Sequence, residues 1–348
     1  MEQKINFTGN EVKLLEKVVV MGGGSWGTAL AVLLAENGNE VTLWEFSSVE
    51  AANMEKEREN SRYLKGVKFP DNLKVTNNLE NILSNASYLI LSIPSQHLRS
   101  ILTKVSDQIS SDLIIVNTAK GLEIASHQRL SEVIKEELLG KFHKNIVILS
   151  GPTHAEEVAL KMPSTIVAAA QDKETAKRVQ KLFSNEYFRV YINSDITGVE
   201  IGGSLKNCIA IAAGIVDGMG FGDNSKAAII SRGTSEIIRF GEKFGADFKT
   251  FSGLSGVGDL IVTCTSKHSR NRYVGECLGK GQSMDEIMKN MIMVAEGVPT
   301  TKAVYEIAKE KNIEMPIIEA LYNVIYEGAN PKNMIEVLMK RELKEEFY

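Results

Sequence analysis

Short apolar runs alternate with polar, helix-like stretches along the first 193 residues. The runs are rich in β-branched side chains and cover residues 18–21, 40–45, 88–94, 113–120, 145–152 and 164–170. Continuous apolar runs of this length, separated by helices, are typical of a parallel sheet whose two faces are both buried. The pattern therefore predicts a doubly wound α/β domain with a parallel sheet over residues 17–193.

The pattern changes in the second half, where long segments carry apolar residues three and four positions apart. Ile201, Leu205 and Ile209 are an example, and no proline occurs between residues 164 and 298. Such spacing is typical of helices, which the absence of proline leaves uninterrupted. We therefore expect an all-α domain over residues 194–348.

Composition and charge narrow the function classes. The chain has 348 residues, 43% hydrophobic and 24% charged, with a formal net charge of −4. This charge gives no general attraction to nucleic acid or to anionic lipid. The longest apolar stretches fall short of the ~18 residues that suggest a membrane span, and the first residues lack the apolar core of a signal peptide. We expect a cytoplasmic protein with no integral membrane segment and no nucleic-acid partner.

Two further features set limits on the chemistry. The three cysteines, Cys208, Cys264 and Cys277, show no CxxC spacing, and the five histidines show no HxxxH pair. A disulfide framework and a metal site are therefore not expected. Residues 1–16 form an N-terminal extension, and the sequence leaves open whether it is a tail, an extra helix or a docking segment.

A glycine cluster lies between the first predicted strand and an alanine-rich helix, in the stretch VVVMGGGSWGTALA. Gly22, Gly24 and Gly27 make the pattern GxGxxG. In this context the glycines permit a tight turn, close approach of a pyrophosphate, and close packing of helix on strand. Glu45 ends the second strand 21 residues beyond Gly24, near the place of an acid that binds ribose hydroxyls. The alternative is that the glycines serve the turn alone, but this placement favours dinucleotide binding.

The end of the second strand bears on which dinucleotide is bound. Glu45 would accept hydrogen bonds from a ribose diol and repel a 2′-phosphate, and Phe46 beside it carries no positive charge. These residues favour NAD over NADP. In the alternative arrangement Glu45 points into solvent, Phe46 lies against the adenine, and Arg58 or Arg62 approaches a phosphate.

Two strand ends supply candidates for a neighbouring substrate site. In IIVNTAKGLE, Lys120 follows a strand, where open α/β sheets bind ligands, although a solvated lysine fits the same position. In SGPTHAEEV, Thr153 and Glu156 have the spacing of a helix capping box. Backbone amides at Gly151 and Thr153 are also suited to receive an anion.

Lys206 and Asn207 lie in an otherwise apolar helical segment, with Gly202 and Gly203 one turn away. Glycines inside a helix each cost ~1 kcal/mol relative to alanine, so they usually serve packing or access. Burial would lower the pKa of the Lys206 amine and suit it to proton exchange with a hydroxyl or carbonyl oxygen. A structural ion pair with Glu200 or Asp259 is the alternative.

The segment SGVGDLIVTCTSKHSRNR gathers further polar groups. It holds Asp259, Thr263, Ser269, Arg270 and Asn271. Arginine beside asparagine and hydroxyls is suited to a phosphate, because the guanidinium donates two parallel hydrogen bonds. A basic, solvated start of a helix is the alternative.

These motifs occur together and in order, and the chain resembles the NAD(P)-dependent glycerol-3-phosphate dehydrogenases from Lys17 to the C-terminal region. The resemblance rests on GGGSWGTALA, LSIPSQHLR, NTAKGLE, LSGPTHAEEVA, EIGGSLKNCIAIAAGIVDGMGFGDNSKAA and GVGDLIVTCTSKHSRNR. It implies a Rossmann-like domain followed by a helical substrate domain, and a homodimer. The implied reaction is reversible hydride transfer between NAD(P)H and dihydroxyacetone phosphate, giving sn-glycerol 3-phosphate for glycerophospholipid synthesis.

The resemblance also implies roles for individual residues. Lys206 would transfer the proton, Lys120 would orient and polarise the C2 oxygen, and Asp259 would support the lysine and the substrate hydroxyls. The phosphate would be held by Arg270 and Asn271, with Asn207, Thr263, Ser269, Gly151 and Thr153 also at the substrate. Positions near the cofactor are Gly22, Gly24, Ser25, Trp26, Gly27, Glu45, Phe46, His97, Lys120, Ala155, Arg270, Val294 and Glu296. Phe46 stands where bacterial-type members often carry a basic residue, which weakens the expectation of NADP use.

Two rival functions are compatible with parts of this pattern. A related β-hydroxyacid or ketopantoate-type reductase would share the architecture, but Arg270 and Asn271 beside two lysines favour a phosphorylated substrate. A non-catalytic NAD-sensing module would keep the glycine motif, but would be expected to lose Lys206 or Asp259, and both are present.

Overall fold

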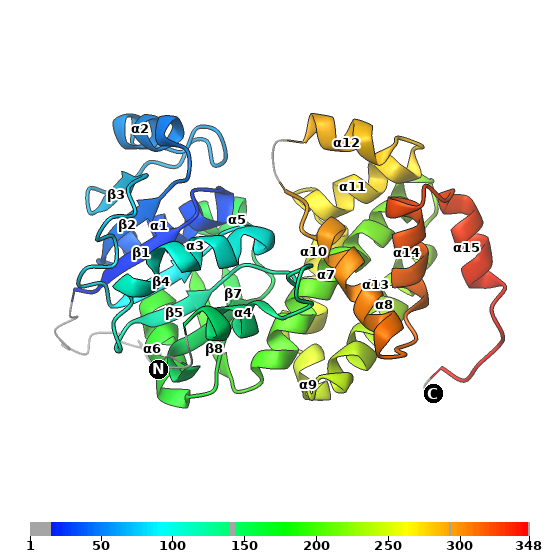
Figure 1. The fold of residues 1–348 in the computed structure, drawn as a ribbon. Coiled ribbons are helices and arrows are strands. Elements are labelled where there is room, and N and C mark those ends of the chain that lie inside the picture. Colours follow the sequence, from blue (N-terminus) through cyan, green and yellow to red (C-terminus); the bar gives the residue numbers. More distant parts are fainter. Residues whose placement is uncertain (1–14, 139–142, 292–293, 347–348) are drawn as a thin grey trace, which may run out of the picture.

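The computed structural model describes residues 15–138, 143–291 and 294–346. Figure 1 shows two parts side by side: a sheet covered by helices, drawn blue to green, and a group of helices, drawn green to red. Most of the predicted N-terminal extension, residues 1–14, lies outside the described residues.

The first part contains one eight-stranded sheet. Its strands are β1 (Lys17–Met21), β2 (Glu40–Trp44), β3 (Leu73–Thr76), β4 (Tyr88–Leu91), β5 (Ile114–Asn117), β6 (Ile146–Ser150), β7 (Ser164–Ala170) and β8 (Phe188–Asn193). The order across the sheet is β3-β2-β1-β4-β5-β6-β7-β8. Each of the six predicted apolar runs contains a strand. Strands β3 and β8 were not predicted, because these edge strands alternate buried and less buried positions instead of forming a continuous apolar run.

The sheet is parallel, as predicted, except at one junction. Strand β7 pairs with β6 in the antiparallel sense, with Ser150 opposite Val167, whereas every other neighbouring pair is parallel. The connection from β6 to β7 holds one helix of five residues, α5 (Ala155–Ala159). A short return of this kind suits antiparallel neighbours, since a parallel pair needs a longer crossover.

Helices cover both faces of the sheet, as the doubly wound prediction requires. They are α1 (Ser25–Glu36), α2 (Ser48–Glu57), α3 (Leu98–Val105), α4 (Leu130–Glu137) and α6 (Lys173–Phe183), with short turns η1 (Ser95–His97), η2 (Ser106–Gln108) and η3 (His143–Asn145). Helices α1 and α6 bury apolar side chains in one cluster with the sheet. Helices α3 and α4 bury theirs in a second cluster that includes alternate residues of the same strands.

The second part is helical, as predicted. Its helices are α7 (Ile196–Gly218), α8 (Asp223–Lys243), α9 (Phe248–Phe251), α10 (Asp259–Thr265), α11 (Arg270–Gly279), α12 (Met284–Asn290), α13 (Gly297–Glu310), α14 (Pro316–Tyr326) and α15 (Pro331–Met339), with a π-helical turn, η4 (Leu254–Gly258). Figure 1 shows α7 reaching from the sheet into the middle of this group.

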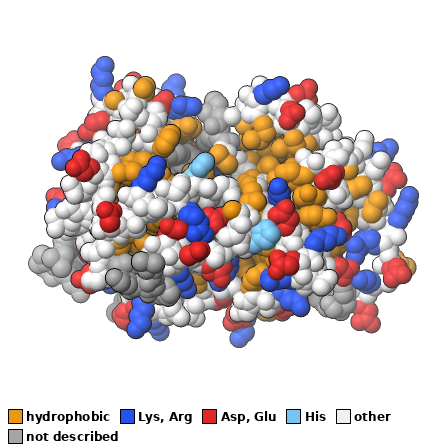
Figure 2. Space-filling model, in the orientation of Figure 1, with side chains coloured by type: hydrophobic (Ala, Val, Ile, Leu, Met, Phe, Trp, Pro, Cys, Tyr) orange, Lys and Arg blue, Asp and Glu red, His pale blue; other side chains and the backbone are white. Residues whose placement is uncertain are grey.

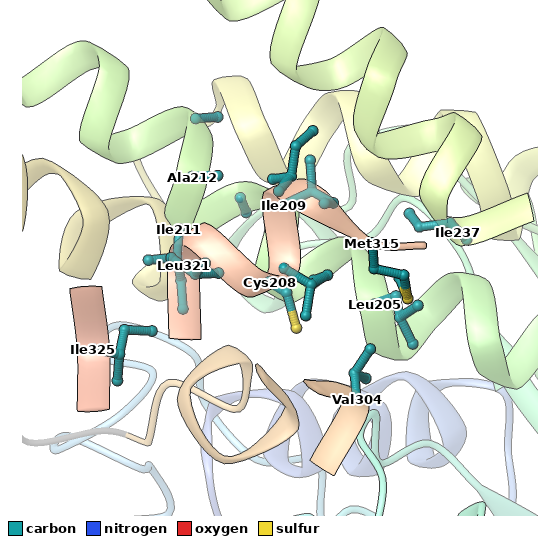
Figure 3. Close-up of a cluster of buried hydrophobic side chains, with 14 of the residues drawn as sticks. Leu205, Cys208, Ile209, Ile211, Ala212, Ile237, Val304, Met315, Leu321 and Ile325 are labelled. Carbon is teal, nitrogen blue, oxygen red and sulfur yellow. The ribbon is translucent and has the colours of Figure 1, made fainter. Parts of the chain in front are cut away.

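Helix α7 forms the centre of the helical core. Leu205, Cys208, Ile209 and Ile211 project from it toward neighbouring helices in Figure 3, and all four are buried. Gly275 of α11 lies so close to α7 that a Cβ there would collide with the Ile211 carbonyl. Among the described helices, α7 is the one long and apolar enough to cross a membrane, but its most apolar window is entirely buried inside the protein.

Candidate active site

A cavity of about 560 Å³ lies between the carboxyl ends of the sheet strands and the helical part. It is lined by the turns after β1, β2, β4, β5 and β6 and by residues of α7, α10 and α11. Such an edge of an open α/β sheet is the usual place for ligands. Basic and acidic side chains are intermixed on the face drawn in Figure 2, so charge selection has to come from the cavity itself.

The glycine turn forms one end of this cavity. Gly22 has φ of 114°, and a Cβ there would collide with the Ser92 carbonyl. A Cβ at Gly27 would collide with the carbonyl of Gly22, so this glycine lets α1 pack against the turn. A Cβ at Gly24, the N-cap of α1, would meet nothing within 4 Å. The open space beside Gly24 at the start of this 12-residue helix therefore fits a dinucleotide pyrophosphate.

Glu45 faces the glycine turn, and the alternative in which it points into solvent is not observed. Its Oε1 accepts the Ser47 backbone N–H at 2.9 Å, and its Oε2 lies against Gly23. Phe46 is 75% exposed and lines the cavity with its ring edge-on to Trp44, at 6.4 Å between ring centroids. This arrangement offers a carboxylate to a ribose and a flat apolar face to an adenine.

The two arginines considered for a phosphate are engaged elsewhere. Arg58 donates to the carbonyls of Pro70 and Leu73 at 2.7 and 2.6 Å. Arg62 pairs with Glu50 at 3.0 Å. Neither arginine is among the residues that line the cavity. The alternative in which Arg58 approaches a cofactor phosphate is therefore wrong for this conformation.

The other predicted cofactor residues all line the same cavity. They are Ser25, Trp26, His97, Lys120, Ala155, Arg270, Val294 and Glu296. Glu296, the N-cap of α13, is partly buried, and loss of solvent around its carboxyl raises the pKa of that group although hydrogen bonds from Ser95 oppose the shift. It joins the helical part to the turn after β4.

Lys120 and Lys206 share one buried carboxylate, that of Asp259. Lys120 Nζ donates to Oδ2 at 2.7 Å, and Lys206 Nζ donates to Oδ1. Lys206 also donates to Thr263 Oγ1 at 2.8 Å. Of the two acids considered for Lys206, Glu200 pairs with Arg129 at 3.0 Å instead. The ion pair and the proton-transfer role are thus compatible, since both lysines still line the cavity.

Burial lowers the pKa of Lys206 to about 7. The Asp259 carboxylate opposes this shift, whereas the positive charge of Lys120 adds to it. One carboxylate cannot balance two ammonium groups where water is excluded, so the site favours loss of a proton from Lys206. A lysine with this pKa can both give and accept a proton near neutral pH.

The glycines of α7 near Lys206 serve close packing. A Cβ at Gly202 would lie 2.7 Å from the Ser255 carbonyl, and a Cβ at Gly203 would lie 2.5 Å from Ser150 Oγ. The turn η4 and the end of β6 therefore pack directly onto the backbone of α7. This close packing brings Lys120, Asp259 and Lys206 together from three elements.

The predicted phosphate residues line the cavity from α7 and α11. Ser269 caps α11 by accepting the Arg272 N–H at 3.2 Å. Asn271 donates to Asn207 Oδ1 at 2.9 Å and accepts the Gly297 N–H at 2.9 Å, so its side chain orients that of Asn207. Arg270 is exposed in the cavity wall, and no ion pair involves it in the described part of the chain. Its guanidinium and the Asn207 amide are available to a phosphate.

Two predicted substrate residues do not line the cavity. Asp259 is completely buried and supports the lysines from behind, and the Gly151 carbonyl accepts from Lys120 at 3.3 Å. Thr153 does line the cavity, but the capping-box prediction is wrong. The chain stays extended through His154, which caps α5, while Thr153 Oγ1 donates to the Gly151 carbonyl at 3.3 Å.

The sequence analysis did not predict several cavity residues, among them Tyr63, Lys104, His154 and His268. The two histidine rings, one from each part of the molecule, lie 5.8 Å apart, and burial lowers the pKa of His154. Both histidines stand inside motifs already singled out, SGPTHAEEV and SKHSRN. Lys104 is seven residues after His97, which is the spacing of one helix face and was the available signal. No group of three or more His, Cys, Asp or Glu residues that could hold a metal ion occurs among the described residues.

Comparison with known proteins gives consistent matches over both parts of the chain. Residues 17–176 match the family model described as NAD-dependent glycerol-3-phosphate dehydrogenase N-terminus, and residues 195–336 match the model of its C-terminus.

Individual proteins agree with these matches. The chain is 48% identical over 337 residues to a glycerol-3-phosphate dehydrogenase (NAD(P)+) of Ligilactobacillus salivarius, covering 96% of this chain and 100% of that protein. It is 50% identical over 331 residues to a protein of the same name from Chlorobium limicola, covering 95% and 99%. The crystal structure of glycerol-3-phosphate dehydrogenase from Coxiella burnetii is similar with a TM-score of 0.90 at 35% identity, covering 94% of this chain and 99% of that one.

Proposed function

Since the chain belongs to the family of NAD-dependent glycerol-3-phosphate dehydrogenases, we propose that it interconverts dihydroxyacetone phosphate and sn-glycerol 3-phosphate with NAD(P)(H). One observation carries the proposal. Lys120 and Lys206 converge on Asp259 beside a cavity that the glycine turn and Arg270 also line. This arrangement supplies a turn that can bind the cofactor, a lysine that can donate a proton, and a positive charge for the substrate phosphate, all of which the reaction requires.

The substrate is held by its phosphate at the α11 end of the cavity. Arg270 neutralises the charge, and Asn207 donates its amide, which Asn271 keeps in place. A fixed phosphate places the carbonyl carbon of the substrate near the lysines. A dinucleotide held at the glycine turn would supply or take up the hydride at that carbon.

The lysines act on the substrate oxygen. During reduction Lys206 gives a proton to the C2 oxygen, and Lys120 orients that oxygen and stabilises the negative charge that develops on it. During oxidation the neutral amine of Lys206 takes the proton from the C2 hydroxyl. Asp259 touches neither reacting atom and is a positioning residue for both lysines.

The cofactor end favours NAD(H). Glu45 is placed beside the glycine turn, where its carboxylate accepts hydrogen bonds from a ribose diol and repels a 2′-phosphate. NADP(H) is the second cofactor, in keeping with the NAD(P)+ in the names of the relatives.

The experiment follows NADH oxidation at 340 nm with dihydroxyacetone phosphate, beside unphosphorylated dihydroxyacetone, and is repeated with NADPH. Turnover that depends on the phosphate ester is expected. Equal turnover of both ketones would point instead to a reductase for another hydroxy acid, and nucleotide binding without turnover would favour the NAD-sensing module.

Further parts of the proposal concern the protein in the cell. We propose a homodimer located in the cytoplasm, in which residues 17–193 bind the cofactor, residues 194–348 complete the substrate site, and the product serves glycerophospholipid synthesis. Support comes from the family and from the end of β8 at Asn193, just before α7 begins at Ile196. Light scattering of the purified protein tests the dimer, and fractionation of the source cells tests the location.

A further inference from the structure

Helix α3 forms one wall of the cofactor end of the cavity. His97 at the N-cap of α3 and Ser100, Ile101 and Lys104 within it line the cavity, and each of them lies three or four residues from two of the others. Such positions lie on a single face of a helix. Phe46 and Tyr63 line the same cavity from the segments that follow β2 and α2.

Lys104 is the cation of this wall whose charge is not balanced by an acid. Within the described residues no hydrogen bond or ion pair involves its ammonium group. The acids of the neighbouring α4 are engaged by Arg99, which contacts Glu136 and Glu137 at 3.0 and 2.7 Å. Lys104 is also exposed, so its long side chain is free to turn toward a ligand.

The other charged residues at the cofactor end of the cavity do not favour the 2′-phosphate that distinguishes NADP(H) from NAD(H). Glu45 presents a carboxylate beside the glycine turn, and the nearest arginine considered for the site, Arg62, is paired with Glu50. A nucleotide 2′-phosphate carries close to two negative charges at neutral pH and needs a countercharge. Lysine is well suited to this because its ammonium group binds phosphate as a point charge without a fixed geometry.

We propose that Lys104 binds the 2′-phosphate of NADP(H) and thereby sets how well this enzyme uses NADP(H) beside NAD(H). The inference rests on the proposed use of the cavity for a dinucleotide. Glu45 favours the ribose diol, and Lys104 offsets its repulsion when the 2′-hydroxyl carries a phosphate.

Calorimetry with adenosine 2′,5′-bisphosphate and AMP tests the contact without any turnover. Replacement of one charged contact should matter only for the probe with the 2′-phosphate, so Lys104→Met is expected to weaken the bisphosphate about tenfold and AMP less than about twofold. Lys104→Arg keeps the charge and should bind both probes nearly as the wild type does. The selective loss should also shrink at about 0.5 M salt, because salt screens exposed charges.

A matched control is Lys74→Met. Lys74 is an exposed lysine of β3 that does not line the cavity, so its loss should leave both affinities unchanged. Equal weakening of both probes by Lys104→Met, or an unchanged bisphosphate affinity, would overturn the inference. Absence of wild-type turnover of dihydroxyacetone phosphate with NADH, while both probes still bind, would count against the proposed function alone.

Discussion

Ser95 donates both its backbone N–H and its hydroxyl to the carboxylate of Glu296, at 3.0 and 2.5 Å. The two residues are 201 positions apart in the sequence. Ser95 belongs to the turn after β4, and Glu296 caps α13 of the helical part. Because Glu296 lines the cavity, this contact joins the two parts of the molecule at the cavity wall.

Removing this contact should weaken cofactor binding. Glu296→Ala leaves the buried Ser95 N–H without a partner, at a cost of ~1–3 kcal/mol. We expect the KM for NADH to rise about tenfold, since 1.4 kcal/mol corresponds to that factor. Glu296→Gln keeps one acceptor for the N–H and should change the KM much less. Equal KM values for the Ala and Gln variants would contradict this account.

Lys206 carries the proton in the proposed reaction. Lys206→Met keeps the length and apolar body of the side chain but has no proton to give, so kcat should fall by about 10²–10⁴-fold. NADH binding, followed by fluorescence, should stay within about twofold because no cofactor contact is removed. A comparable loss of NADH binding would assign Lys206 to the cofactor site.

Arg270 is expected to separate phosphorylated from unphosphorylated substrates. Arg270→Gln should raise the KM for dihydroxyacetone phosphate by about 10–100-fold, which is the range for loss of a charge-assisted hydrogen bond of ~1.5–3 kcal/mol. The slow turnover of unphosphorylated dihydroxyacetone should stay unchanged. If both substrates lost activity together, Arg270 would act mainly on the cofactor.

Much of this architecture follows from local sequence patterns. Such patterns predict where helices and strands lie better than they predict which elements pack or pair together. The continuous apolar runs predicted six of the strands. The glycine spacing predicted the turn at Gly22 that lines the cavity. The antiparallel junction of β6 and β7 could not be predicted, because strand direction depends on how the connection through α5 packs.

The features of the site that depend on contacts between residues far apart in the sequence could not be predicted. The sequence named Lys206 and Asp259, but left open whether Glu200 or Asp259 would pair with the lysine. That choice depends on the packing of η4 against Gly202, which no local pattern encodes. The contact of Ser95 with Glu296 and the unpaired charge of Lys104 were missed for the same reason.

A second buried ion pair should govern stability without touching the reaction. Glu200 of α7 pairs with Arg129 at 3.0 Å and accepts the Ser131 N–H at 2.8 Å, which ties α4 to α7. Glu200→Ala leaves the partly buried Arg129 guanidinium with only the more exposed Glu132, and loss of one partner of a fully buried pair, which is the upper bound here, costs ~3–5 kcal/mol. Thermal unfolding should show a clearly lower Tm, whereas Glu132→Ala, which removes a more exposed partner of Arg129, should change it little. Similar Tm values for the two variants would place the stabilising energy elsewhere.

The shifted pKa of Lys206 predicts opposite pH profiles for the two directions of the reaction. Burial lowers this pKa to about 7, and Asp259 limits the shift. Reduction needs the protonated lysine, so its kcat/KM should fall as the pH rises through about 7. Oxidation needs the neutral amine, so its kcat/KM should fall as the pH drops through the same range.

The substrate phosphate ionises near pH 6, so the alkaline decline of the reduction cannot come from it. Asp259→Asn removes the charge that keeps the proton on Lys206, and the residual activity should show a decline displaced to lower pH. If kcat/KM changed with pH in the same direction for reduction and for oxidation, Lys206 would be excluded as the group that exchanges the proton.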